Sequence, residues 1–303
     1  MMSVSIGIPA HNEENNIGVL LCNLSKQKLS DGFSLSEIVV VASGCTDHTE
    51  DIVKKAIESD PRVRLIVEKE RNGKASAINI LLEQCKSEVL VMEPADTLPH
   101  DGSLYKLVKP FNDKHVGAVG GRPVPINPEN SVIGYIPHVI WDLHHYIAQS
   151  EDSADKYFHI SGEFCAIRTG IIRRIPTDIV NDDAYIGLQI WKAGYRVVYA
   201  PEATATMKGP TNVSDILSQR RRVISGHMQL EKEHDAYITS INSSQIIKIL
   251  PKVIRLRPKK LLGTIVGVGL EAYSHVLARR DLSNGKAHHK WSMVSSTKTL
   301  IAR

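Results

Sequence analysis

Strand-like and helix-like segments alternate through the first third of the sequence, and this alternation restricts the chain to one class of fold. Short apolar runs alternate with stretches of helical spacing, in the order 4–10, 13–27, 37–43, 48–59, 63–70, 75–86 and 89–92. Such a β-α alternation predicts a mainly parallel sheet with helices on its faces. Ligands of open α/β sheets bind beyond the carboxyl ends of the strands. We therefore expect the functional residues in the loops that follow the apolar runs.

These loops are polar and chemically distinctive. In chain order they read Pro9-Ala10-His11-Asn12-Glu13, Ser43-Gly44-Cys45-Thr46-Asp47, Arg71-Asn72-Gly73-Lys74 and Glu93-Pro94-Ala95-Asp96. A lysine at a helix entrance behind a glycine can hold a phosphate, although no GxxxxGK[ST] loop is present, which argues against a P-loop NTPase. Two of the acids have ordinary alternatives: Glu13 can face a helix dipole, and Asp47 can cap the following helix.

The second half of the chain adds two motifs of charged residues. Three further strand-like runs lie at 117–125, 159–168 and 195–203. They are separated by a proline- and histidine-rich stretch, to which we assign no regular element, and by one helix that begins with Asp182 and Asp183. Adjacent acids repel, so either both are solvated first-turn residues or one serves as a general base. Gln219 and Arg222 share a helix face, which is either a solvated basic face or a diphosphate-binding one.

Composition and charge narrow the class of protein. A chain of 303 residues with 42% hydrophobic and 23% charged residues can bury a substantial globular core. The N-terminus does not read as a secretory signal, so we expect a cytoplasmic protein. The four cysteines have no metal-ligand spacing and are expected to be free thiols: Cys22, Cys45, Cys85 and Cys165.

The net charge of +4 is unevenly distributed. From residue 245 onward there are 12 lysines and arginines but two acids, so a basic tail follows an acidic body. Its uncharged run, 261–270, is shorter than the ~20 residues that cross a bilayer. We therefore expect the tail not to cross a membrane. It either lies on anionic headgroups, as a peripheral anchor, or packs on the body or a partner chain. Without aromatic residues interleaved for base stacking, nucleic acid is not an expected partner.

The motifs taken in order resemble those of the large inverting glycosyltransferase family of the GT-A fold, whose members include cellulose, chitin and hyaluronan synthases and dolichyl-phosphate mannose synthase. The segments that carry the resemblance are "IPAHNEE", "ASGCTDHT", "NGKASAIN", "ADT", "GEFCAIRTGIIRRIP", "NDDAYIGLQIWKAGYRVVYAPEA" and "QRRRV". The resemblance implies an α/β, Rossmann-like GT-A domain at 1–230, with a mainly parallel mixed sheet and helices on both faces. A basic amphipathic helical tail would then occupy 231–303.

The resemblance also implies roles for individual residues. A nucleoside-diphosphate sugar would be bound by Pro9, Ala10, His11, Glu13, Ser43, Asp47, Lys74, Ala95, Asp96, Gln219 and Arg222. Asp183 would be the catalytic base that deprotonates the acceptor, with Glu163 and Asp182 on the acceptor side. Asp96 would also bind a divalent cation, Mg²⁺ or Mn²⁺. The donor's departing diphosphate carries growing negative charge, which a hard cation and basic side chains can stabilise.

The chain departs from the family pattern in four motifs: at Pro94, at Ala42-Ser43 in place of paired aspartates, at Asn181-Asp182 in place of Thr-Glu, and at Val223. Pro94 replaces the first aspartate of Asp-x-Asp, so the cation would rest on Asp96, water, donor oxygens and the neighbouring Glu93. Val223 replaces the tryptophan of the final Gln-x-x-Arg-Trp motif, which makes a long polysaccharide acceptor less expected.

These observations favour an inverting, cation-assisted glycosyltransferase that moves a hexosyl or N-acetylhexosaminyl group to a hydroxyl or phosphate acceptor. A glycan and a lipid-linked molecule are both candidate acceptors, the latter at the inner face of a membrane. Two alternatives stay open. One is a non-catalytic sugar-nucleotide-binding or scaffold protein, which the missing aspartate suggests. The other is a nucleotidyltransferase, although the glycine-rich entrance loop of that class is absent.

Overall fold

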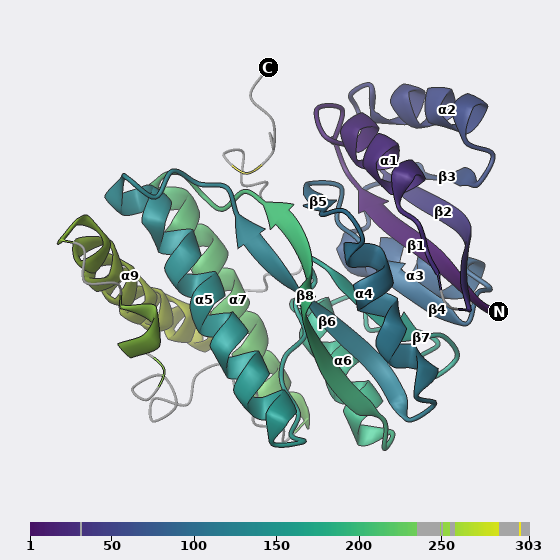
Figure 1. Ribbon diagram of the computed structural model, residues 1–303. Coiled ribbons are helices and arrows are strands. Elements are labelled where there is room, and N and C mark those ends of the chain that lie inside the picture. Colours follow the sequence, from purple (N-terminus) through teal and green to yellow (C-terminus); the bar gives the residue numbers. More distant parts are fainter. Residues whose placement is uncertain (31, 235–248, 250, 255–257, 285–296, 298–303) are drawn as a thin grey trace.

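In the computed structural model, the described residues form a mixed eight-stranded sheet flanked by helices (Figure 1). The description covers residues 1–303 apart from 31, 235–248, 250, 255–257, 285–296 and 298–303. The strands are β1 Met2–Ala10, β2 Phe33–Ser43, β3 Val63–Glu68, β4 Val89–Met92, β5 Thr97–Pro99, β6 Val116–Pro125, β7 Cys165–Arg168 and β8 Arg196–Met207. The helices are α1 Ile17–Lys26, α2 Thr49–Ser59, α3 Lys74–Gln84, α4 Ser103–Val108, α5 Val132–Ser153, α6 Asp182–Lys192, α7 Val213–His234 and α9 Pro258–Ser283, with a 3₁₀ turn at Lys109–Asn112.

The strand order is β3-β2-β1-β4-β7-β6-β8-β5. The first four of these strands run parallel, which confirms the fold predicted from the β-α alternation. Strand β7 then pairs antiparallel with both β4 and β6, so the sheet is mixed. The parallel arrangement brings the carboxyl ends of β1, β2 and β4 to one edge, where their polar loops meet.

Both faces of the sheet are covered, and the central strands are apolar for that reason. In β2, Ile38 and Val40 pack into a core shared with α1 and α4, whereas Val39 and Val41 pack into a second core shared with α3 and α6. Successive side chains of a strand point to opposite faces, so an uninterrupted apolar run is what a doubly covered strand requires. The predicted helices on both faces are confirmed.

Helix α5 is the main element that the sequence analysis left unassigned. It covers 22 residues and includes Pro137. A proline in the interior of a helix is usually unfavourable, because it removes a backbone hydrogen bond. The Ser131 side chain caps its start by accepting a hydrogen bond from the Gly134 N–H at 2.9 Å. Apolar residues on α5 pack against β6, β8 and α9, and this tertiary burial outweighs the local effect of the proline.

Helices α5, α7 and α9 lie together at one end of the sheet (Figure 1). Helix α7 runs through residue 230, and the predicted division of the chain at that point stays a prediction. Much of the predicted tail lies outside the described residues, but α9 confirms a C-terminal helix. By length and composition Lys260–Ser283 could cross a membrane. The apolar stretch is therefore longer than the uncharged run 261–270, and the expectation that the tail does not cross a membrane stays a prediction.

Candidate active site

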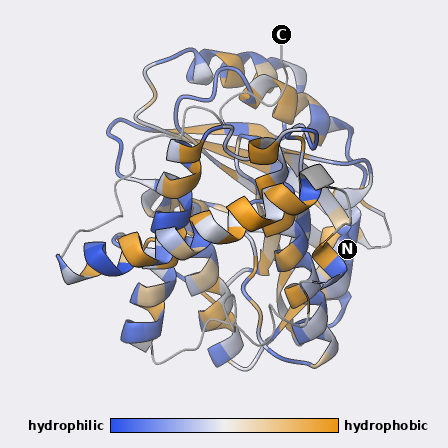
Figure 2. Ribbon diagram, turned by 90° about the vertical axis from the view of Figure 1, so that its left-hand side faces the viewer, coloured by the Kyte–Doolittle hydropathy of each residue, from blue (hydrophilic) through white to orange (hydrophobic). Residues whose placement is uncertain are grey.

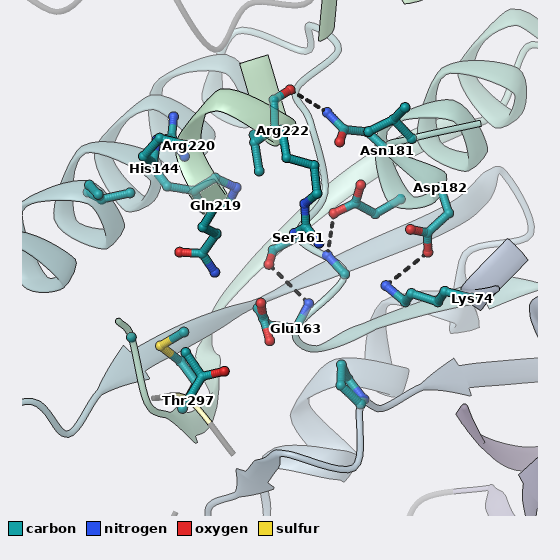
Figure 3. Close-up of a pocket in the computed structure, with 18 of the residues that line it drawn as sticks. Lys74, His144, Ser161, Glu163, Asn181, Asp182, Gln219, Arg220, Arg222 and Thr297 are labelled. Atoms are coloured by element: carbon teal, nitrogen blue, oxygen red, sulfur yellow. Dashed lines mark hydrogen bonds and ion pairs between the residues drawn. The ribbon is translucent and has the colours of Figure 1, made fainter. Parts of the chain in front are cut away.

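A cavity of about 1000 Å³ opens where the carboxyl ends of the parallel strands face helices α5, α7 and α9. Nearly all the residues singled out from the sequence line it: Pro9, Ala10, His11, Glu13, Ser43, Lys74, Ala95, Asp96, Glu163, Asp182, Asp183, Gln219 and Arg222. Figure 3 shows Gln219 and Arg222 of α7 reaching toward the space that Glu163 also borders. The topology thus gathers motifs that are up to two hundred residues apart in sequence.

Asp47 is the one predicted site residue that does not line the cavity. Its carboxylate accepts hydrogen bonds from the Thr49 hydroxyl at 2.6 Å and from the Glu14 N–H at 3.1 Å. These bonds hold the pKa of Asp47 below its usual range against the effect of burial. Asp47 therefore fastens the second loop to the first and to the start of α2, and its placement beside the donor stays a prediction.

His11 and Ser43 lie side by side at the end of the cavity formed by β1 and β2. The Ser43 carbonyl can only accept, so His11 Nδ1 donates to it, at 2.7 Å. The Ser43 hydroxyl donates to Glu68 at the end of β3. Glu68 also accepts from Ser76 of α3, at 2.5 Å, so it ties the second and third loops together.

Lys74 stands at the start of α3, after Gly73, whose φ of 95° suits glycine. Its Nζ lies 3.0 Å from Asp182 Oδ2 (Figure 3). Burial alone would lower the pKa of the Lys74 ammonium, but the Asp182 and Asp183 carboxylates outweigh burial and raise it. Lys74 is therefore a permanent cation inside the cavity.

Asp183 is held as an anion at the start of α6. Its Oδ2 accepts the Gly162 N–H at 2.7 Å, and its Oδ1 accepts the Ala184 N–H at 2.8 Å. His159 Nε2 lies 3.3 Å from Oδ1, within ion-pair distance. Burial opposes ionisation, but His159, Lys74 and the Gly162 N–H hold the pKa of Asp183 well below its usual range.

Gly162 allows this arrangement because it has no side chain. A Cβ at this position would stand 3.0 Å from Asp183 Oδ2 and 3.2 Å from Asp183 Cβ. The close approach of the backbone is what lets the N–H donate to the carboxylate.

A group of histidines backs the Asp183 carboxylate, and the sequence analysis did not identify it. His144 of α5 and His227 of α7 meet the His159 ring edge to face, with centroids 6.2 and 5.1 Å apart. His144 Nε2 donates to the His159 carbonyl at 3.1 Å. Burial lowers the pKa of His144 to about 4 and that of His227 well below its usual range. The available signal was His159 itself, a polar residue four positions before the motif glutamate Glu163.

Six acidic side chains line the cavity together with four lysine or arginine side chains. Burial, reinforced by Asp96, raises the pKa of Glu163 to about 7. Burial likewise raises the pKa of Asp96, opposed by Lys74 and Arg222, and it lowers the pKa of Arg222 to about 9. Carboxyl groups thus outnumber the lysine and arginine side chains along the lining. A diphosphate entering this site would add negative charge, so an additional cation would be stabilising.

Asp96 fits such a cation, whereas Glu93 does not. Within the described ranges no group of three or more His, Cys, Asp or Glu could hold a metal ion. A cation at Asp96 would therefore need diphosphate oxygens and water as its other ligands, which is how Mg²⁺ is commonly bound. Glu93 is fully buried beside β4 and accepts a hydrogen bond from the Thr97 hydroxyl. Burial raises its pKa well above the usual range, so it is a neutral structural acid.

The other half of the cavity is apolar. One side of α5 supplies Ile136, Val139, Ile140, Leu143 and Ile147 to its wall, opposite Gly267, Val268 and Ala272 of α9. Arg220 of α7 also borders it and pairs with Glu271 of α9 at 2.6 and 2.7 Å. No local sequence pattern indicates these contacts, because they join segments whose relative placement is set only by packing.

Comparisons with known proteins agree with this site. The model of the family described as glycosyl transferase family 2 matches residues 5–175. Among curated relatives, the poly-beta-1,6-N-acetyl-D-glucosamine synthase of Staphylococcus aureus (strain MSSA476) is 26% identical over 224 residues, which cover 72% of this chain and 53% of the relative. The probable glycosyltransferase YdaM of Bacillus subtilis (strain 168) is 26% identical over 272 residues, covering 86% and 60%. The chain thus spans about half to three fifths of the length of these relatives.

Solved structures share the fold. The mannosyltransferase PcManGT from Pyrobaculum calidifontis, solved in complex with GDP-Man and Mn²⁺, superposes with a TM-score of 0.62 at 22% identity and covers 93% of this chain and 79% of its own. The glucosyl-3-phosphoglycerate synthase from Mycobacterium tuberculosis, solved with Mn²⁺, UDP and phosphoglyceric acid, gives 0.52 at 18% identity, covering 75% and 78%. This likeness confirms the GT-A fold.

Proposed function

Since this chain belongs to glycosyl transferase family 2, we propose that it transfers a sugar from a nucleoside-diphosphate sugar to an acceptor hydroxyl or phosphate, with inversion at the anomeric carbon. One observation carries the proposal. The Asp183 carboxylate is fixed as an anion in the same cavity as two cations suited to a diphosphate, Lys74 and Arg222. A base and a diphosphate site in one cavity are what a direct displacement needs.

The proposed chemistry assigns a task to each group. The acceptor oxygen attacks the anomeric carbon and passes its proton to Asp183, while the bond from that carbon to the diphosphate breaks. The departing diphosphate takes the electron pair, and Lys74 and Arg222 stabilise its charge. In the proposed displacement the acceptor attacks from the side opposite the departing diphosphate, so the new bond forms on the face opposite the old one. Gln219 would orient the diphosphate end, and Glu163 and Asp182 the acceptor end.

A divalent cation is the proposed cofactor, with Asp96 as its protein ligand. The excess of acids over bases in the cavity and the Mn²⁺ in the two solved neighbours support this assignment. When bound, the cation would neutralise charge on the diphosphate. Mg²⁺ and Mn²⁺ are both suitable for oxygen ligands.

The proposed sugar is a hexose or an N-acetylhexosamine, and the proposed acceptor is a glycan or a lipid-linked molecule at the cytoplasmic face of a membrane. The names of the relatives support the first part, since they include N-acetylglucosamine and mannose transfer. The basic tail supports peripheral contact with a membrane, because lysines and arginines are attracted to anionic headgroups.

The test is a panel of UDP- and GDP-linked sugars, titrated calorimetrically with Mn²⁺, with Mg²⁺ and with chelator, followed by assays of diphosphate release. We expect one nucleotide to bind in a cation-dependent manner and its sugar to be transferred or slowly hydrolysed. Cation-dependent binding without any turnover, over a range of acceptors, would favour the non-catalytic alternative. Absence of nucleotide-diphosphate binding would contradict the proposal altogether.

A further inference from the structure

Helix α9 turns its apolar side away from the protein. Seven large apolar side chains on this helix are 42–61% exposed: Leu261, Leu262, Ile265, Val268, Tyr273, Val276 and Leu282. At 3.6 residues per turn the first six fall on one side of the helix and form one stripe, the outer stripe of α9, and Leu282 is exposed near its C-terminal end. Figure 2 shows this helix crossing the front of the molecule with a high content of hydrophobic residues. A surface helix of a globular protein normally has the opposite orientation, with its apolar stripe inward.

The inward side of α9 is polar, and ion pairs hold it there. Lys260 and Asp281 are buried and Glu271 is partly buried. They pair with Glu129 of the loop before α5, with Arg221 of α7 and with Arg220 of α7, respectively. Rotating α9 to bury the outer stripe would break all three ion pairs. Their charges would then be exposed or left buried without a partner. The outward orientation of the apolar residues is therefore built into the fold.

The cavity reaches the outer stripe. Val268 and Ala272 are exposed, and both also line the cavity together with Gly267. From this opening the apolar wall of α5 leads past Ile140 toward the polar half that contains Asp183. An elongated molecule with one polar end and one apolar end would match this sequence of surfaces.

We propose that the outer stripe of α9 docks on a lipid bilayer, and that the cavity opening beside it admits the apolar chain of an amphiphilic acceptor directly from that bilayer. The second part rests on the proposed function and specifies its acceptor: a molecule whose chain lies between α5 and α9 while its hydroxyl or phosphate reaches Asp183.

Charge favours a bilayer as the occupant of the stripe. The exposed Arg279 and Arg280 follow the stripe at the C-terminal end of α9, and the region from residue 245 onward is strongly basic. Two such basic surfaces would repel each other in a symmetric dimer, whereas anionic lipid attracts them. The helix lies on the surface rather than crossing it, because crossing would place the carboxylate of Glu271 near the middle of the bilayer and away from Arg220.

The first experiment is flotation with vesicles of phosphatidylcholine, with and without phosphatidylglycerol, at low and high salt. We expect the full chain to float with anionic vesicles and to lose part of its binding at high salt. The double variant Ile265→Asp, Val276→Asp should bind at least tenfold more weakly. Ile57→Asp is the matched control, since Ile57 is an exposed apolar residue on α2, and it should float as the unmodified chain does.

The second experiment follows the chain of the acceptor. Trp141 of α5 lines the cavity, so a single-chain alkyl phosphate with bromine on its chain should quench its fluorescence. We expect quenching that saturates, that disappears in Trp141→Phe, and that a non-brominated alkyl phosphate competes away. Inorganic phosphate should not compete.

The outcomes separate this inference from the proposed function, which is tested by nucleotide binding without lipid. Equal flotation of the double variant and the unmodified chain would overturn docking by the stripe. The unmodified chain could instead fail to float and form a dimer in analytical ultracentrifugation, with the double variant monomeric. That result would show that a second copy covers the stripe. Saturable flotation without quenching of Trp141 would overturn entry of the acceptor chain.

Discussion

Replacing Asp183 by asparagine tests the assignment of the catalytic base directly. The substitution keeps the shape of the side chain but removes its charge and one of its two accepting oxygens. A general base contributes about 10²–10⁴-fold to a rate, which corresponds to about 3 to 5 kcal/mol of transition-state stabilisation. We expect Asp183→Asn to lower kcat by that factor. The donor affinity should stay within about threefold, because the base acts on the acceptor and not on the nucleotide.

The same substitution has a predictable effect on stability. The carboxylate accepts from the Gly162 and Ala184 N–H groups, but an amide can accept from only one of them and would present its own NH₂ to the other. One buried donor is left without a partner, at a cost of about 1 to 3 kcal/mol. Thermal unfolding should therefore show a lower midpoint for a chain that is still folded.

The assay is release of nucleoside diphosphate in the presence of acceptor, together with calorimetric titration of the donor. Asp178→Asn is the matched control: it makes the same chemical change at an exposed position shortly before α6, and it should behave as the unmodified chain. If a folded Asp183→Asn variant keeps kcat within about tenfold of normal, Asp183 only caps α6 and the reasoning about the base is refuted.

Three further predictions concern the surroundings of this carboxylate. Glu163 has a pKa raised to about 7, first by burial and then by Asp96, so folding favours its protonated form and stability should fall as the pH rises from about 4 to about 7. Glu163→Gln should remove this dependence of stability on pH. In urea unfolding, the variant should therefore be more stable than the unmodified chain at about pH 8 and equally stable at about pH 4. Asp96→Ala and chelation of the cation should each weaken nucleoside-diphosphate binding by a similar factor and should not add when combined; additive losses in calorimetry would place the cation elsewhere. Gly162→Ala would put a Cβ 3.0 Å from Asp183 Oδ2 and should lower kcat about tenfold or more with an unchanged donor affinity, whereas Gly269→Ala, where no atom lies within 4 Å of the added carbon, should be neutral.

Local pattern was enough to predict the parallel half of the sheet and the place of the site. Apolar runs such as that of β2 are buried on both faces, so their composition already reports the layers above and below them. The carboxyl ends of parallel strands meet at one edge whatever the details of packing. For this reason Lys74 and Asp96 could be assigned to one cavity from spacing alone.

Other features depend on contacts between segments far apart in the chain, and no local pattern encodes them. Asp47 had two consistent interpretations, and only the folded chain shows that its carboxylate is bonded to Thr49 and Glu14. The approach of His159 to Asp183 depends on how the segment before β7 packs on α6.

The C-terminal helix shows the division most clearly. Its sequence determines that α9 is long, largely apolar and basic near its ends. The sequence alone does not determine which side of α9 faces the protein. Apolar residues of a surface helix usually face inward, so the pattern by itself would favour the opposite orientation. The ion pairs of Glu271 with Arg220 and of Asp281 with Arg221 decide that orientation. They form only when α7 is folded beside α9, and they turn the apolar stripe outward.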